Sequence, residues 1–594
     1  MNSLLKAAAA VIVAASVGCS YSYASAAAPP AKKHTHKTAA PKGPTVEEQI
    51  QSLRQDLEGQ INALKSDLAT RDAELKQAQQ QAADAQAAAQ KAQQQAADQE
   101  QAASQNATAV NTLQSTVNDL KANSSSLAVT LSDETSQIKK QLQNPDALYF
   151  KGITLSPTGS FLAAETVWRQ GATGGDINTA FTGVPLDFSN AAQMSEFQGS
   201  GRQSRLALKA TGKLKDATLT GYYEMDWLGT GITSNNNQSN SYVLRQRQLW
   251  GDARFNNGWD FSAGQGWSLA TETTKGLQRG SEILRSTIDP QYTAGFVWAR
   301  QYSARATKDI GSKFFMGISA EGAETLNPAG ANLPSNLLIG SAGTGGGLYN
   351  STANYSFNRT PDFVAKIAAE PGWGHWELFG IARSFRDRIY PTSGTPFVDN
   401  AWGGGFGGGF RGPLASNKVS IGLKGLWGQG VGRYGSSTIA DVTLLPWGGI
   451  SPLHGFSALS TLEFTPTPRL SAYLNYGGDY IGRDWKFDPV SGKNVGYGTY
   501  DTDMSGCTTE PTSGGPFSPS TPSGCKGNNK DVQEFTAGYS YNFYKGPKGT
   551  FRYGLQYARF QRDLWSGNGG TTNPSNSAKG VDNMFWTQVR YYLP

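Results

Sequence analysis

The stretch from Glu534 to Phe543, EFTAGYSYNF, alternates between two kinds of side chain. Aromatic residues and alanine occupy every second position, with polar residues or glycine between them. The same alternation returns at 550–557, TFRYGLQY, and at 585–593, FWTQVRYYL. Because successive side chains of a β-strand point to opposite faces, each stretch predicts a strand with one aromatic face. Strands of about ten residues with this pattern are typical of barrels that cross an outer membrane, whereas a soluble sandwich would need less aromatic surface.

The composition changes abruptly near residue 145. No Phe, Trp or Tyr occurs between Ala24 and Leu148, and almost all of the 70 Gly residues follow Tyr149. We therefore predict two structural parts that join near Asn144-Pro145. Only 16% of the residues are charged and the formal net charge is +6, which is too small for a nucleic-acid partner. No apolar run after the N-terminus is long enough for a membrane-spanning helix.

Long and short connections alternate along residues 146–594. The short links are at 213–216, 256–258, 308–312, 371–374, 412–416, 466–469 and 545–548. The long links, rich in Gly, Ser and Asn, are at 171–201, 229–240, 270–290, 323–360, 389–402, 429–453, 484–530 and 564–582. This pattern predicts an all-β transmembrane barrel of about 16 antiparallel strands with both ends in the periplasm. If the apolar run from Thr438 to Leu445 is also a strand, the total is 17 or 18.

The first 26 residues are expected to be a signal peptide. Lys6 precedes an apolar run of about 11 residues, and Ala24-Ser25-Ala26 is a typical cleavage site. Lipoprotein processing at Cys19 is the alternative. Residues 27–44 form a basic linker of Pro, Lys and Ala, which is either solvated or a tether to the cell wall or an anionic lipid surface.

Residues 45–144 are expected to form a long α-helical coiled coil in the periplasm. They contain no Pro and one Gly, and apolar residues recur at intervals of three and four, as at Val46, Ile50, Leu53 and Leu57. A sustained repeat of this kind predicts that helices wind around each other, so the chain would assemble with copies of itself. The alternative is a lone or disordered helix rich in Ala and Gln.

A barrel of sixteen strands leaves a water-filled channel, whereas eight strands are filled by their own side chains. No plug domain is visible in the sequence, so we expect passive diffusion. We expect no cofactor, and the presence of only four His residues argues against a His-rich metal site. Catalysis is not expected, because none of the four His residues lies at an inward strand position beside a Ser and a carboxylate. Cys507 and Cys525 share a long loop and should form a disulfide in an oxidising compartment.

Charged residues opposite the apolar face of a strand are predicted to line the lumen. The set comprises Arg202, Arg205, Lys209, Glu224, Asp226, Arg245 and Arg247 on the second to fourth strands, and Lys275, Arg279 and Arg285 in the third long loop. Further inward residues are Lys366, Arg383, Lys424, Arg552 and Arg590. We expect the third loop to fold inward and narrow the pore. Clustered guanidinium groups suit carboxylate or phosphate solutes, and the alternative is that they merely pair with Glu or Asp.

The fourth strand poses a conflict between charge and alternation. Arg245 and Arg247 share a face with Leu249. Facing the two Arg residues to lipid would cost roughly 2–4 kcal/mol each near the middle of the bilayer, so we place them inward. That choice turns Gln246 and Gln248 outward, where polar amides fit a subunit interface better than lipid.

Two short motifs carry a family resemblance. Arg202-Gln203-Ser204-Arg205-Leu206 on the second strand, and Ala263-Gly264-Gln265-Gly266-Trp267-Ser268 before the third long loop, resemble the DcaP-type trimeric porins. That resemblance implies a trimeric 16-stranded barrel after an N-terminal coiled coil, with a preference for anions such as dicarboxylates. The phosphate-selective porins share this layout and are the second candidate.

We therefore expect a homotrimeric porin in the outer membrane of a Gram-negative-type cell. It would admit small hydrophilic solutes passively, with anions such as dicarboxylates or phosphate preferred. The rival hypothesis is structural: the coiled coil and basic linker would tie the outer membrane to the cell wall, and the barrel would serve as the anchor.

Overall fold

The computed structural model describes residues 120–121, 123–124, 147–173, 175–179, 181–229, 243–341, 355–414, 416–508, 510, 525–568 and 578–594. The predicted signal peptide and linker lie outside these residues, and so does the predicted coiled coil apart from four positions. The chain divides into two units, Met1–Gln143 and Asn144–Pro594, and the strands belong to the second. No helix among the described residues has the length and apolar character needed to cross a membrane.

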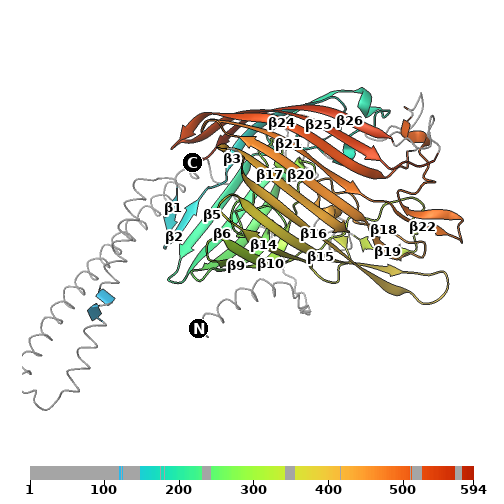
Figure 1. Cartoon of the computed structure of the whole chain (residues 1–594), viewed down its shortest axis with the longest axis horizontal. Coiled ribbons are helices and arrows are strands. Elements are labelled where there is room, and N and C mark those ends of the chain that lie inside the picture. Colours follow the sequence, from blue (N-terminus) through green and yellow to red (C-terminus); the bar gives the residue numbers. More distant parts are fainter. Residues whose placement is uncertain are drawn as a thin grey trace, which may run out of the picture. The chain divides into compact units, whose positions relative to one another are not determined.

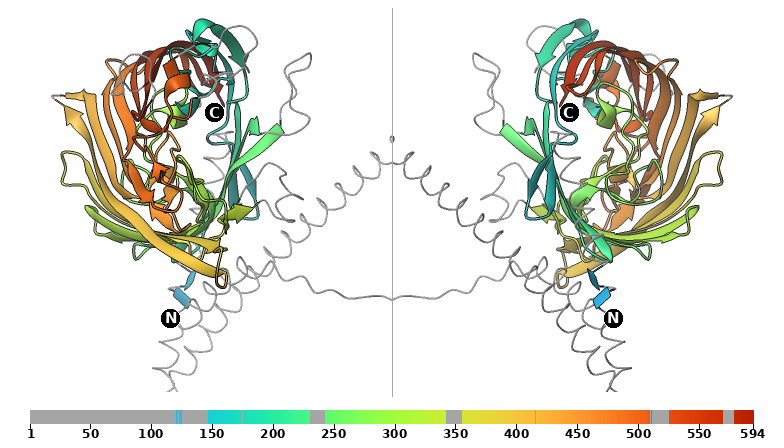
Figure 2. Two further views of the ribbon diagram at one scale, coloured as in Figure 1. Left: turned by 90° about the vertical axis from the view of Figure 1, so that its right-hand side faces the viewer. Right: turned by 90° about the vertical axis from the view of Figure 1, so that its left-hand side faces the viewer.

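The second unit is a closed antiparallel β-barrel of sixteen strands, as the alternating connections predicted (Figure 1). The barrel strands are β3 Phe161–Arg169, β4 Glu196–Ser200 continued by β5 Arg205–Lys213, β6 Ala217–Gly229, β7 Val243–Phe255, β8 Trp259–Trp267, β9 Arg300–Ile310, β10 Phe314–Glu321, β14 Asp362–Ala369, β15 His375–Ile389, β16 Phe397–Leu414, β17 Ser416–Gln429, β20 His454–Phe464, β21 Leu470–Ile481, β24 Asn529–Gly546, β25 Gly549–Leu564 and β26 Lys579–Tyr592. Pairing of β26 with β3 closes the ring, which is visible end-on in Figure 2.

Shorter strands and 3₁₀ turns lie at the two ends of the barrel. At one end lie β1 Leu148–Phe150 and β2 Ile153–Ser156, and β2 pairs with β5. The long connections hold β11 Leu337–Leu338, β12 Gly340–Ser341, β13 Tyr355–Ser356, β18 Val442–Leu444, β19 Ile450–Pro452, β22 Asp484–Asp488 and β23 Lys493–Tyr497. They also hold the 3₁₀ turns η2 Phe181–Gly183, η3 Ala191–Gln193, η4 Pro290–Tyr292, η5 Gly432–Tyr434 and η6 Ser505–Thr508. Cys507 and Cys525 form the predicted disulfide.

The apolar run at 438–445 does not add strands to the barrel. Part of it forms β18, which pairs only with β19 in a separate two-stranded sheet within the long connection 430–453. The alternative total of 17 or 18 strands is therefore wrong. A short hairpin inside a loop satisfies its backbone hydrogen bonds locally and does not need the barrel wall.

The two faces of the wall differ as the alternation predicted. On β14, Phe363 and Ile367 are 48% and 56% exposed, whereas Lys366 is 2% exposed. The same division holds on β5, where Leu206 and Leu208 are exposed and Ala207 is buried. Large apolar side chains thus cover the outside and polar ones fill the inside, which is the reverse of a water-soluble protein and suits lipid.

Candidate functional site in the barrel lumen

The third long loop, residues 268–299, runs inside the barrel. Lys366 of β14 donates a hydrogen bond to the backbone oxygen of Thr271 at 2.8 Å, and Arg590 of β26 donates one to that of Ile288 at 2.6 Å. β14 and β26 are the eighth and last strands of the sixteen, so they lie on opposite sides of the barrel. The loop therefore crosses the lumen, in agreement with the expectation that it folds inward.

The far half of the third loop rests on an acidic part of the wall. The backbone nitrogen of Ala294 donates to Glu534 of β24 at 2.7 Å, and that of Gly295 donates to Asp479 of β21 at 3.3 Å. Gly295 has a φ of +78°, and a Cβ there would lie 1.9 Å from the backbone oxygen of Ala458. Only glycine lets the loop lie this close to the wall.

Three arginines meet two carboxylates on another part of the wall. Arg247 lies 2.6 Å from Glu224 and 2.8 Å from Asp226, Arg245 lies 2.7 Å from Asp226, and Arg205 lies 3.5 Å from Glu224. The Arg247 side chain is 2% exposed, whereas that of Arg245 is 30% exposed. The structure thus brings together five of the predicted pore residues. The three arginines pair with two carboxylates, so one guanidinium is in excess over the carboxylates.

A β-bulge in β7 resolves the conflict between charge and alternation. The register between β6 and β7 shifts at Glu224, and Arg247 has no directly paired residue across the ladder. One extra residue in a strand reverses the faces that follow it. Arg247 therefore points inward while Leu249 is exposed outside. The predicted outward placement of Gln248 is wrong, because Gln248 is buried and pairs with Glu224, and only Gln246 stays outside.

Other predicted residues lie apart from this cluster. Arg202 pairs with Asp176 of the first long loop at 2.7 Å. Lys209 is on the inward face of β5 but exposed, and Lys275 is exposed on the third loop. These three residues are therefore not brought together with the arginine cluster.

Arg279 and Arg285 of the third loop have different environments. Arg285 pairs with Glu272 of the same loop at 2.7 Å. Arg279 is buried and donates to Ser262 at 2.9 Å and to Ser303, and it makes no ion pair with any described residue. Burial lowers the pKa of Arg279 to about 9. Arg279 is thus a positive group held by neutral oxygens beside the lumen wall.

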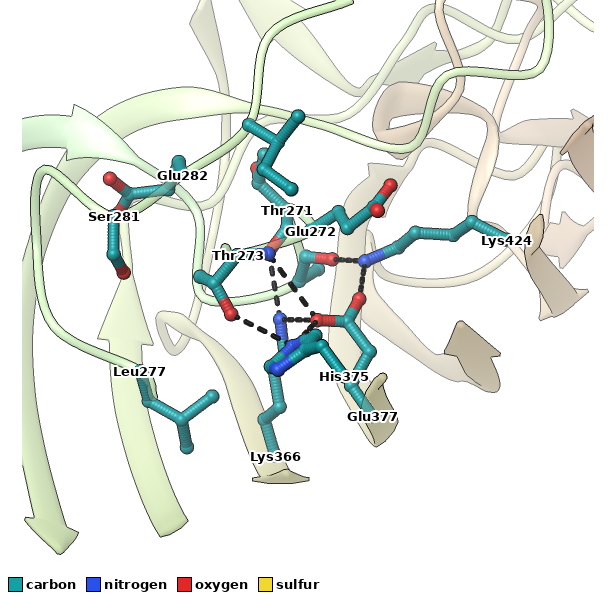
Figure 3. Close-up of polar contacts among 12 residues, drawn as sticks. Thr271, Glu272, Thr273, Leu277, Ser281, Glu282, Lys366, His375, Glu377 and Lys424 are labelled. Atoms are coloured by element: carbon teal, nitrogen blue, oxygen red, sulfur yellow. Dashed lines mark hydrogen bonds and ion pairs between the residues drawn. The ribbon is translucent and has the colours of Figure 1, made fainter. Parts of the chain in front are cut away.

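The sequence interpretation missed two inward side chains at the start of β15. His375 and Glu377 are buried and join Lys366 and Lys424 against the third loop (Figure 3). The alternation that places Arg383 inward also places both of them inward, so the signal was present in the sequence.

A closed sixteen-stranded barrel with an apolar outer face, a charged inner face and a third loop folded inside is the architecture of porin-type outer-membrane barrels. No protein-family model and no curated protein matches the chain. Among solved structures, it is similar to the outer membrane channel DcaP of Acinetobacter baumannii, with a TM-score of 0.50 and 14% identity over 75% of this chain and 99% of that chain.

Two other solved structures match the chain with lower TM-scores. OprB of Pseudomonas putida has a TM-score of 0.41 and 12% identity, over 77% of this chain and 97% of that chain. The anion-selective porin from Comamonas acidovorans has a TM-score of 0.36 and 12% identity, over 74% of this chain and 98% of that chain. At these identities the likeness concerns the fold alone. The barrel has the fold of the DcaP channel, which agrees with the resemblance of the two sequence motifs.

Proposed function

We propose that the barrel is a passive outer-membrane channel for small hydrophilic solutes, with anions such as dicarboxylates or phosphate preferred. The polar inner face, the apolar outer face and the loop crossing the lumen support a channel that is narrowed from within. No chemical step is part of this function, because diffusion through a fixed pore needs only a wetted path and fixed charges.

The observation that carries the anion preference is the excess of guanidinium groups beside the third loop. Arg205, Arg245 and Arg247 surround two carboxylates, and Arg247 also donates to Gln291 of the loop at 3.0 Å. A narrow pore holds little salt between a wall charge and a passing ion, so the wall charge is poorly screened. The acids on β21 and β24 oppose this field, and we expect preference for anions without exclusion of cations.

Removing the charge of Arg245 tests this function. Arg245 is the most accessible of the three, and in an Arg245→Gln variant Arg205 and Arg247 still pair with the two carboxylates. We expect the reversal potential in a salt gradient to shift toward cations while the barrel stays folded. Arg469→Gln is the control, because Arg469 is exposed in a short connection and should leave the reversal potential unchanged. A wild-type barrel that prefers cations, or one that carries no current, would refute the proposal.

The channel is further proposed to be a homotrimer held together by its barrel. On the outer face, the Gln246 amide donates to Gln265 at 3.1 Å and to the Tyr302 hydroxyl at 3.2 Å. Polar amides facing lipid are unfavourable, whereas a protein neighbour can satisfy them. Ala263 and Ala304 pair directly beside this group and leave that part of the wall smooth. These features support a contact between subunits on β7, β8 and β9.

A further inference from the structure

Glu377 pairs with two lysines, and both lysines donate hydrogen bonds to the third loop (Figure 3). One carboxylate oxygen lies 2.6 Å from Lys366 Nζ, and the other bonds Lys424 Nζ. Lys366 also donates to the backbone oxygen of Thr271 at 2.8 Å, and Lys424 donates to that of Ala270 at 2.6 Å. Two successive loop carbonyls are thus held by two ammonium groups that share one buried carboxylate. Without Glu377 the lysines would repel each other inside the barrel.

His375 connects the same carboxylate to a second one. Its Nδ1 lies 2.7 Å from Glu370 Oε1, and its Nε2 lies 3.2 Å from Glu377 Oε2 and 3.2 Å from Thr273 Oγ1. The Thr273 hydroxyl donates its hydrogen to the backbone oxygen of Gly276 at 2.7 Å, so Oγ1 can only accept from His375. Both ring nitrogens therefore face acceptors, and the geometry requires the imidazolium form, which has two N–H donors.

The two carboxylates also hold the loop directly. Glu377 Oε2 accepts the backbone N–H of Thr273 at 3.4 Å, and Glu370 Oε1 accepts that of Gly276 at 3.3 Å. A neutral imidazole would present a lone pair to one of these carboxylates and lose one donor. The contacts at Thr273 and Gly276 thus depend on the proton that His375 carries.

Other charged groups near His375 already have partners. Arg411 of β16 lies opposite His375 in the strand register, but its guanidinium pairs with Glu272 at 2.6 Å and with Glu463 at 2.8 Å. Glu272 in turn also pairs with Arg285. Within the cluster, Lys366 and Lys424 balance Glu370 and Glu377, and among these side chains only an imidazole has an ordinary pKa, about 6.5, close to neutrality.

We propose that Glu377, Lys366 and Lys424 are positioning residues for the third loop and that His375 makes their hold on it depend on pH. At low pH the imidazolium fixes residues 270–276 against β14, β15 and β17. As the pH rises and the ring loses a proton, this part of the loop is released. The inference goes beyond the proposed function and uses it only where a current is recorded.

The reactivity of a buried thiol measures this release without any current. Thr271 is fully buried and Cys is close to it in size, so Thr271→Cys reports access to the clamped segment. Rates with a water-soluble thiol reagent are compared at each pH between this parent and the same chain carrying His375→Gln, since the comparison cancels the ionisation of the thiol itself. Glutamine presents one donor nitrogen and one acceptor oxygen and does not titrate, so it imitates the neutral ring, which also has one donor and one acceptor atom.

We expect the parent thiol to react roughly tenfold more slowly than the His375→Gln thiol at pH 5.5, as fits the loss of one charge-assisted hydrogen bond. At pH 8 the two rates should lie closer together than at pH 5.5, because a larger share of the parent chains has then lost the imidazolium proton. His454→Gln is the matched control, since His454 is exposed and bonds Gln429 of the wall, and it should match the parent at both pH values. Equal rates at pH 5.5, or a difference that persists unchanged at pH 8, would overturn the inference.

Two further measurements separate positioning from folding and from conduction. Glu377→Gln should expose the thiol at both pH values while the barrel stays folded, as judged by its migration on a gel before and after heating. If this variant does not fold, Lys424→Met is used in its place with the same expectation. In single-channel recordings, brief closures should become more frequent from pH 5.5 to 8 in the parent and not in His375→Gln. A barrel that carries no current would refute the proposed channel. The thiol rates would still test whether His375 makes the hold on the third loop depend on pH.

Discussion

At Gly264 the conformation of a single residue decides how two strands pack. Its φ is +126°, and an added Cβ would lie 2.3 Å from the backbone oxygen of Leu249 and 2.6 Å from the Cα of Trp250. Gly251, on the adjacent strand β7, has an ordinary φ and open space where a Cβ would be. The pair separates the effect of a backbone constraint from the general effect of adding a methyl group.

Gly264→Ala should destabilise the barrel by about 1–3 kcal/mol from backbone strain alone, and by more if the contact with β7 does not relax. Gly251→Ala should change stability by less than about 0.5 kcal/mol, as is usual for a surface position. Urea unfolding of the refolded barrel in lipid vesicles measures both. If the two variants unfold at the same urea concentration, the positive φ at Gly264 does not constrain the fold.

Other single residues show where sequence reasoning reached its limit. The charge argument correctly turned Arg247 inward, but alternation alone could not reveal the bulge that turns Gln248 inward as well. A bulge is a change of register between two strands, and one strand read by itself contains no register. The inward side of Glu377, unlike that of Gln248, could have been predicted, because Glu377 and Arg383 lie an even number of residues apart on the same strand.

The third loop is the element whose role was easiest to expect and whose contacts were hardest to predict. Its length and position before β9 suggested that it folds inward. Its partners lie on strands far along the chain, such as Lys366, Glu534 and Arg590. Those strands meet the loop only because the barrel closes, so their distance from it depends on the register of every pair around the ring. The strands can be predicted from the sequence, but the registers of all the strand pairs around the ring cannot.

We expect the ion selectivity to depend on pH because of Asp289 in the third loop. Burial raises the pKa of Asp289 to about 7, although Gln556 donates to its carboxylate at 3.0 Å. An acid whose pKa is higher in the folded than in the unfolded state binds more protons when folded. Its stabilising effect is therefore present at low pH and is lost as the pH rises through 7.

We expect the anion preference to fall as the pH rises from 6 to 8, because Asp289 then adds a negative charge inside the narrowed lumen. Asp289→Asn should remove the part of this change that the Asp289 charge contributes and leave the part that follows from loss of the His375 proton. The measurement is the reversal potential in a fixed salt gradient at each pH. A parent whose reversal potential is the same at pH 6 and pH 8 would show that Asp289 does not titrate there.

At the scale of the whole molecule, either of two regions could hold the proposed trimer together. The coiled coil predicted for 45–144 would supply one contact, and the smooth outer face of β7, β8 and β9 would supply the other. Ala304 on this face and Ala365 on β14 are both exposed alanines on the outside of the barrel. Only Ala304 adjoins the polar group of Gln246, Gln265 and Tyr302. Separate changes in the two regions can therefore assign the contact.

Substituting Leu113, Val117 and Leu120 together by Asp should disrupt the coiled coil and leave the barrel trimeric, because heptad core positions do not hold unpaired charge. Ala304→Trp should instead give monomers, since a large ring would hold two smooth walls apart. Ala365→Trp is the matched control and should stay trimeric, because a Trp facing lipid is tolerated. Sedimentation in detergent gives the mass of each variant. Monomers after the triple Asp change, with trimers retained in Ala304→Trp, would place the contact in the coiled coil and contradict the barrel interface.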